Sequence, residues 1–112
     1  MDQLRIVVAN DPRAYREAIA GVLQALRPQV VVVNVEPDDL DREVAEHPPQ
    51  VVTCSRLTEV VQARSRSWVV LYPDGQAWSS INIAGQQTTV TGIEVDDLLA
   101  VADQTAQLAQ AR

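Results

Sequence analysis

Several residue types are missing or scarce in this sequence, and each absence excludes a class of structure. The sequence has no lysine and no phenylalanine, and it has 1 cysteine and 1 histidine. A single cysteine cannot form a disulfide within the chain, and a structural zinc site needs several cysteine or histidine ligands. We therefore expect a fold that an aliphatic core stabilises, without a disulfide or a structural metal.

The charge balance argues against nucleic acid as a direct partner. The formal net charge is -6, and arginine carries every positive charge. Binding to phosphate backbones requires clustered lysine and arginine side chains. The sequence also lacks a signal peptide pattern and any run near the ~20 apolar residues that span a bilayer. We expect a cytoplasmic domain that does not bind a membrane.

Four apolar runs rich in valine predict the buried strands of a parallel sheet. They cover residues 4–9, 30–35, 51–54 and 68–72. Continuous β-branched runs, rather than strict alternation with polar residues, are typical of strands covered on both faces. At 112 residues the chain has the usual size of one domain, so we treat residues 1–112 as a single domain.

Helical periodicity between these runs predicts the connections. A helix is expected over residues 12–26, with Asp11 as its cap and Pro12 in its first turn. Further helices are expected between residues 38 and 48, over residues 57–63, and from about residue 96 onward. Strands that alternate with helices predict a three-layer α/β sandwich, under the rule of right-handed crossovers.

The segment 73–92 departs from this alternation. It is rich in Thr, Ser, Ile, Val and Gly, with Ile81, Ile83 and Val90 at alternating positions. We expect one or two extended segments around a turn at Ala84 and Gly85 in place of a helix.

Three short motifs resemble the receiver domain of bacterial response regulators, the signalling proteins of two-component systems. In "NDPRAYRE", Asn10 and Asp11 stand where the family has an acidic pair, and the Arg-Glu pair matches one inside the family's first helix. In "PPQVVTCS", Ser55 stands at the phosphoacceptor aspartate, and in "TVTGIEVDDLL", Thr91 stands at an invariant lysine. The resemblance implies a flavodoxin-like fold, with a mainly parallel five-stranded sheet of order 2-1-3-4-5, a reduced third helix and an extended segment replacing the fourth helix.

The departures from the family lie at its chemistry. Phosphoryl transfer to a receiver needs a carboxylate nucleophile, a divalent cation and a cationic side chain beside the product. Ser55, Asn10 and Thr91 each remove one of these requirements. We therefore expect a degenerate domain that is not an enzyme and that holds no metal and no cofactor. The Ser55 hydroxyl can cap a loop or accept a phosphoryl group, and we prefer the loop cap; Cys54 is interpreted as a small buried apolar residue.

The preferred function is a pseudo-receiver signalling or regulatory domain that acts through protein contacts without aspartyl phosphorylation. Its partner is another protein or a second copy of the chain in a homodimer. The expected interaction surface combines the last helix with the segment 73–92, and its residues are Trp78, Ile81, Ile83 and Leu99.

The alternative function is a small-molecule-binding α/β domain. Open α/β sheets bind ligands at the carboxyl ends of their strands, where the strand order reverses. The residues expected there are Asn10, Asp11, Ser55, Arg56 and Tyr72, which together with Thr91 form the degenerate acceptor pocket of the first interpretation. The stretch "ANDPRAY" has no glycine and so lacks a phosphate-binding loop.

Overall fold

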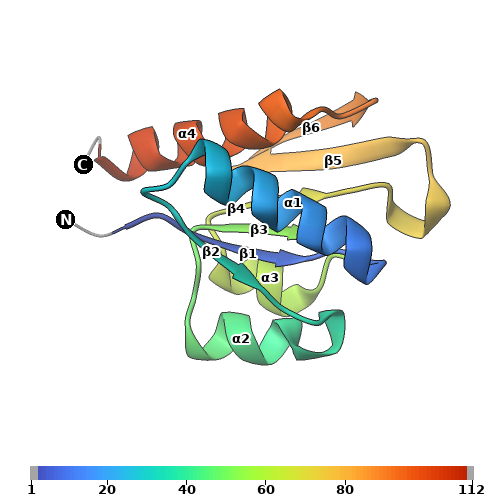
Figure 1. Ribbon diagram of the computed structural model, residues 1–112, viewed down its shortest axis with the longest axis horizontal. Helices are drawn as coiled ribbons and strands as arrows, with labels where there is room; N and C mark the ends of the chain where they lie inside the picture. Colours follow the sequence, from blue (N-terminus) through green and yellow to red (C-terminus); the bar gives the residue numbers. More distant parts are fainter. Residues whose placement is uncertain (1–2, 111–112) are drawn as a thin grey trace.

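Residues 3–110, which this computed structural model describes, form one mixed sheet of six strands with helices on its faces (Figure 1). The strands are β1 (Arg5–Ala9), β2 (Val31–Asn34), β3 (Val51–Cys54), β4 (Ser67–Val70), β5 (Trp78–Ile83) and β6 (Gln86–Thr91). The helices are α1 (Arg13–Leu26), α2 (Leu40–Glu46), α3 (Glu59–Arg64) and α4 (Val95–Gln110), with single 3-10 turns η1 (Pro37–Asp39) and η2 (Pro73–Gly75). Within residues 3–110, every helix falls short of the length and apolar character needed to cross a bilayer.

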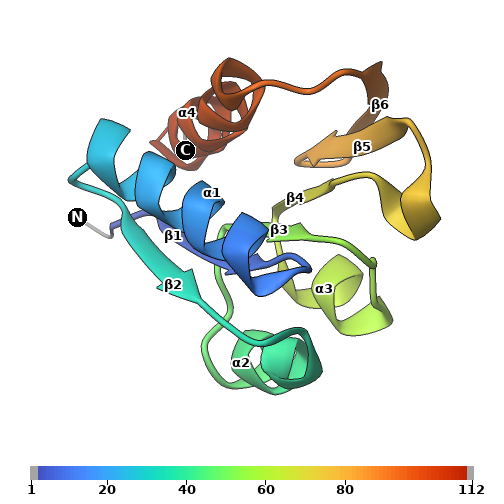
Figure 2. The ribbon, with the colours of Figure 1, turned by 45° about the vertical axis from the view of Figure 1, so that its right-hand side comes forward.

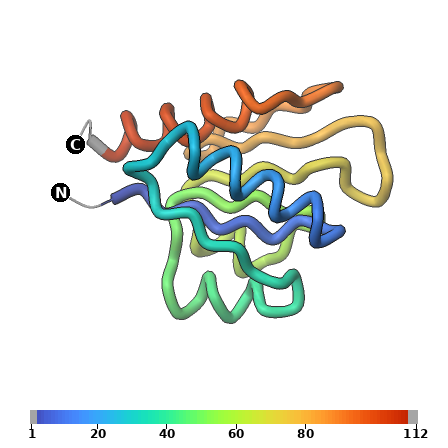
Figure 3. Tube along the Cα trace, in the orientation of Figure 1, coloured from blue at the N-terminus to red at the C-terminus, as the bar shows by residue number. Residues whose placement is uncertain are grey.

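The sheet has a parallel half and an antiparallel half. Its order is β2-β1-β3-β4-β5-β6, which can be followed along the chain in Figure 3. The first four of these strands run parallel, in a register that pairs Val7 with Val33 on one side and with Val52 on the other. β5 is antiparallel to β4, and β6 is antiparallel to β5. The predicted α/β class is confirmed, whereas the prediction of a mainly parallel sheet of five strands is wrong.

The difference arises in the segment 73–92, which contains a tight β-hairpin. Ala84 and Gly85 form its turn with φ values of 51° and 97°. Two-residue turns between antiparallel strands require such positive values, and glycine adopts them readily. The two extended segments around this turn confirm the prediction for this region. The prediction missed that β5 pairs with β4, which moves β6 to the edge of the sheet.

Helices cover both faces of the parallel strands (Figure 2). α1 and α4 pack on one face, over a core that includes Ile6 and Val8. α2 and α3 pack on the other face, over a core that includes Val7 and Ala9. Successive residues of β1 face opposite layers, so both sets of side chains must be apolar. This explains the uninterrupted apolar run that marks the strand in the sequence.

Two residues of the expected interaction surface belong to this core. Ile81 on β5 is 8% exposed and Leu99 on α4 is 9% exposed, because α4 packs over β5. Ile83 is half-buried against the same cluster, whereas Trp78 is 39% exposed. The expected surface is therefore wrong for Ile81 and Leu99, and of its members only Trp78 is well exposed.

The first helix begins without the side-chain cap expected from the sequence. Pro12 occupies the N-cap position, and no side chain bonds to the free N–H groups of the first turn. The Asp11 carboxylate lies 4.0 Å from Arg16 Nη1 instead. The prediction that Asp11 caps α1 is wrong because the helix starts one residue later than expected, which places proline, with no acceptor in its side chain, at the cap.

A buried arginine joins α1 to the ends of two strands. Arg16 is 2% exposed. Its guanidinium donates to Asn34 Oδ1 at 2.7 Å, to the Asn10 carbonyl at 3.1 Å and to Glu36 Oε1 at 3.0 Å. A buried charge is costly unless its hydrogen bonds are satisfied. These bonds therefore fix the start of α1 against the ends of β1 and β2.

A side chain of α1 occupies the free edge of β2. Gln24 Nε2 donates to the Val30 carbonyl at 2.8 Å, and Gln24 Oε1 accepts from the Val32 N–H at 3.4 Å. The side-chain amide offers the donor and acceptor that a neighbouring strand would offer. At this point β2 is protected from pairing with another strand.

We predict that Arg16→Ala lowers the free energy of unfolding by about 3 kcal/mol, because it removes the guanidinium from its buried partners. Urea denaturation followed by circular dichroism measures the loss. Arg13→Ala is the matched control in the same helix, since the Arg13 side chain is 77% exposed and, among residues 3–110, forms an ion pair only with Glu17. We expect its effect to stay below about 0.5 kcal/mol. Equal losses for the two variants would contradict the assigned role of Arg16.

Candidate functional site

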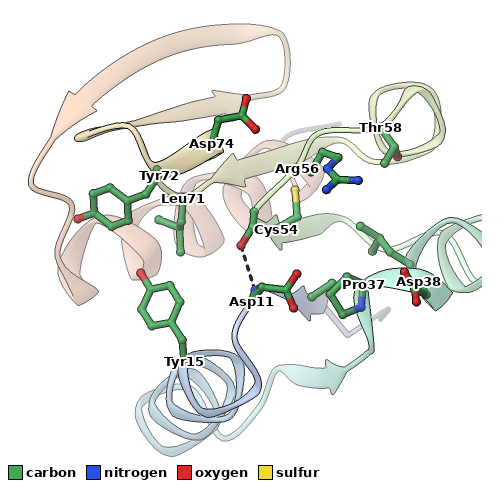
Figure 4. A pocket seen from close by; sticks show the side chains of 14 residues that line it. Asp11, Tyr15, Pro37, Asp38, Cys54, Arg56, Thr58, Leu71, Tyr72 and Asp74 are labelled. Carbon is green, nitrogen blue, oxygen red and sulfur yellow. Dashed lines mark hydrogen bonds between the residues drawn. The ribbon is translucent and has the colours of Figure 1, made fainter.

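A cavity of about 480 Å³ opens at the carboxyl ends of the parallel strands (Figure 4). Strand ends form its floor, and the loops that follow them form its walls. Its lining residues are Ala9, Asp11, Tyr15, Pro37, Asp38, Leu40, Cys54, Ser55, Arg56, Thr58, Leu71, Tyr72, Asp74 and Gly75. The cavity lies where the chain order of the strands reverses between β1 and β3, which is the usual ligand position in an open α/β sheet.

The structure brings together four of the six residues predicted for this pocket. Asp11, Ser55, Arg56 and Tyr72 line the cavity. They come from loops that follow β1, β3 and β4, so the shared carboxyl edge of the parallel strands explains their proximity.

The Ser55 hydroxyl links two of these loops. Its Oγ accepts a hydrogen bond from the Asp11 N–H at 3.0 Å, shown as the dashed line in Figure 4. Asp11 follows β1 and Ser55 follows β3, so the bond joins the loops on either side of the strand reversal. The preferred interpretation of Ser55, a hydroxyl that stabilises a loop, is confirmed.

Asn10 does not line the cavity. Its side chain is fully buried, and Oδ1 accepts a hydrogen bond from Thr53 Oγ1 at 2.9 Å. Its Nδ2 has no hydrogen-bond partner among the described residues. The amide oxygen thus bonds within the protein, and the side chain is not presented to a ligand in the cavity.

Thr91 lies outside the cavity, near the end of the edge strand. It is exposed, and its Cα partner on β5 is Trp78. Two strands, β4 and β5, separate β6 from β3 and hence from Ser55. The expectation that Thr91 completes the pocket is wrong, because β5 inserts between β4 and the segment that resembled the fifth strand of a receiver.

Three ionisable residues of the cavity wall, Tyr15, Asp38 and Asp74, were not predicted as pocket residues from the sequence. Asp38 follows β2, Asp74 follows β4, and Tyr15 projects from the first turn of α1. The position of both aspartates just after parallel strands was a usable signal, since such strands end at the same edge. Burial raises the pKa of the Tyr15 hydroxyl, and the neighbouring Tyr72 raises it further.

Cys54 contributes its side chain to the floor of the cavity and is chemically inert. It is 1% exposed, and burial raises its pKa to about 12, despite an opposing backbone hydrogen bond from Arg56. A thiol nucleophile must be ionised to react. The interpretation of Cys54 as a buried apolar residue is confirmed.

The residues at this edge do not fit the divalent cation that the receiver resemblance implies. Mg²⁺ takes oxygen ligands in near-octahedral geometry, usually with one or two carboxylates. Asp11 is the one carboxylate at the end of β1, the oxygen of Asn10 is bonded to Thr53, and the oxygen of Ser55 is bonded to Asp11. Over residues 3–110, no group of three or more His, Cys, Asp and Glu side chains is placed to hold a metal ion.

We predict that Cys54 makes the protein less stable in alkali. Burial in the folded state raises the pKa of the Cys54 thiol from its ordinary value of 9.0 to about 12. Between these values the unfolded chain has lost the proton while the folded chain keeps it, so stability falls as the pH rises. The contribution approaches about 1.4 kcal/mol per pH unit. In urea denaturation at a series of pH values above 9.0, the free energy of unfolding should fall less steeply with pH for Cys54→Ala than for the wild type. Parallel declines of the two proteins would contradict the raised pKa of Cys54.

Comparison of this chain with protein-family models, with curated proteins and with solved structures gave no match. Its function is therefore inferred from the residues and geometry of the carboxyl edge.

Proposed function

We propose that the chain is a non-catalytic receiver-like domain that regulates a partner through protein contacts, without aspartyl phosphorylation. Two features of the fold support the flavodoxin-like architecture that this proposal includes. The parallel strands follow the order β2-β1-β3-β4, and helices cover both of their faces. The hairpin β5–β6 takes the place of the fourth crossover helix and fifth parallel strand of a receiver.

The hydrogen bond between Ser55 and Asp11 is the observation that carries this proposal. Ser55 stands where a receiver has its nucleophile, and Asp11 stands in the metal-binding pair. In this protein the Ser55 oxygen accepts the Asp11 N–H at 3.0 Å. A serine needs a neighbouring base to become a nucleophile, and the one histidine of the sequence, His47, lies before β3, at the opposite end of that strand. The two positions thus serve the loop structure instead of phosphoryl transfer.

The outer surface of α1 and α4 supports an action through contacts. Val22 and Leu26 on α1 are 37% and 49% exposed, and Val95 and Leu108 on α4 are 40% and 41% exposed. α1 and α4 lie together on one face of the sheet (Figure 2). Exposed apolar side chains on adjacent helices favour a protein-binding surface. This surface replaces the one that was expected from Ile81 and Leu99.

We predict that phosphoryl donors do not modify the protein. Incubation with acetyl phosphate and Mg²⁺ should leave the intact mass unchanged, and titration with beryllofluoride and Mg²⁺ should give no saturable change in tryptophan fluorescence. Ser55→Ala should instead lower the free energy of unfolding by about 1 kcal/mol, because Asp11 N–H loses its acceptor.

A receiver domain that retains its acceptor aspartate serves as the positive control, which shows that the reagents are active. Ser55→Ala and Asp11→Ala are tested beside the wild type. A saturable response in the wild type that disappears in either variant would overturn the proposal.

As a second candidate, we propose that the cavity binds a small organic cation, because it is open and its rim is acidic. Asp11, Asp38 and Asp74 line it, against the single cation of Arg56. Its floor is apolar, with Leu71 and neighbouring side chains. A ligand with an amine and an apolar body would match both parts of this lining.

We predict that a primary-amine ligand of this kind raises the unfolding temperature. At a concentration 100-fold above Kd, binding stabilises the folded state by about 2.7 kcal/mol. Screening amine-bearing metabolites by thermal shift measures the effect. Asp38→Asn and Asp74→Asn should weaken it, and Asp96→Asn, an exposed change on α4, should not. Equal increases in unfolding temperature in all three variants would show that the ligand binds outside the cavity.

A further inference from the structure

The outer edge of β6 is unprotected. β6 (Gln86–Thr91) ends the sheet and pairs with β5 on one side only. Over residues 3–110, no hydrogen bond joins its other side to a side chain or to another segment. In an antiparallel strand, every second residue directs its N–H and C=O away from its paired neighbour. These groups can therefore accept a further strand.

The sequence of this strand lacks the devices that normally prevent edge pairing. "QQTTVT" has no charged residue and no proline, and five of its six residues are exposed. Natural sheets protect their edges with charges, prolines, bulges or covering segments. The opposite edge follows that rule, because Gln24 bonds to the free side of β2. The β2 edge of this sheet is thus protected by a side chain, and the β6 edge is not.

We infer that β6 pairs with β6 of a second copy of the chain, in antiparallel orientation, and joins the two sheets into one. The hydrogen-bond pattern of an antiparallel edge is complementary to itself, which fits a second copy as the partner, and charge favours this surface over the others. Each chain carries a net charge of -6, so most surfaces of two copies repel each other. The β6 edge is uncharged, so two copies can approach there without placing like charges directly opposite.

Symmetry restricts the register of this pairing. The backbone N–H and C=O groups of only every second residue point to the outer edge, so in the dimer odd-numbered residues must pair with odd-numbered residues. The twofold axis therefore lies at a residue that pairs with its own copy, and not between two adjacent residues. The central residues of the strand are Thr88 and Thr89. Either one places two threonines opposite each other at the axis, where their side chains can interact. Trp78, the Cα partner of Thr91, lies beside one end of the joint.

The inference concerns a surface other than the α1 and α4 surface of the proposed function, and it depends only on the sheet edge. Sedimentation and light scattering of the full chain test it. We expect the wild type to form a dimer whose population rises with concentration. Thr89→Lys should weaken the dimer at least about fivefold, because in either register it places two ammonium groups at the axis or beside it. Gln104→Lys, an exposed change on α4 with the same charge difference, should leave the dimer unchanged.

Opposite charges at position 89 of the two copies test whether β6 of one copy pairs with β6 of the other. Thr89→Asp alone should also weaken the dimer, whereas an equal mixture of Thr89→Lys and Thr89→Asp should form a mixed dimer at least as stable as that of the wild type. Circular dichroism checks the fold, and Thr88→Lys replaces Thr89→Lys if that variant does not fold.

Three results would overturn the inference. The first is a wild type that stays monomeric up to about 1 mM. The second is a dimer that Thr89→Lys and Gln104→Lys affect equally, and the third is a mixture of the two charged variants that does not associate. None of these results bears on phosphorylation, which the intact-mass experiment tests separately.

Discussion

The arrangement of this protein depends on the buried guanidinium of Arg16. A charge that is 2% exposed is tolerated only where its donors all find acceptors, and Arg16 finds them at the ends of β1 and β2. The side chain therefore sets the position of α1 over the sheet. Tyr15, the residue before it, is thereby placed at the cavity wall. In this way one buried side chain shapes one wall of the candidate site.

At the carboxyl edge, polar side chains bond within the protein instead of remaining free for chemistry. Ser55 accepts the Asp11 N–H and Asn10 accepts the Thr53 hydroxyl. In both bonds an oxygen atom already accepts a hydrogen bond, whereas a nucleophile or a metal ligand needs that oxygen to be free. What remains available is an open cavity with an acidic rim. The edge thus forms a cavity while these polar atoms serve the fold, and this is the physical basis for proposing a domain that signals by contact.

The sequence predicted the parallel half of the fold well because its signals are local. A strand buried on both faces must be largely apolar, as β1 is over residues 6–9, and α1 shows a clear apolar stripe. Strand pairing in the second half is not local, so the turn at Ala84 and Gly85 predicted a hairpin but not its neighbour β4. That single pairing explains why Thr91 and Ile81 were assigned to wrong places. The pocket was largely predictable because parallel strands end at one edge.

The amide of Gln24 has a consequence for how far assembly can proceed. A sheet that is open along both edges can add copies without limit, as a head-to-tail fibre does. Here Gln24 occupies the free side of β2 at Val30 and Val32, whereas within residues 3–110 nothing bonds to the free side of β6. Two copies joined at β6 use up these open edges, and the edges that remain are the β2 edges that carry Gln24. The glutamine side chain thus favours a closed pair over continued addition of copies.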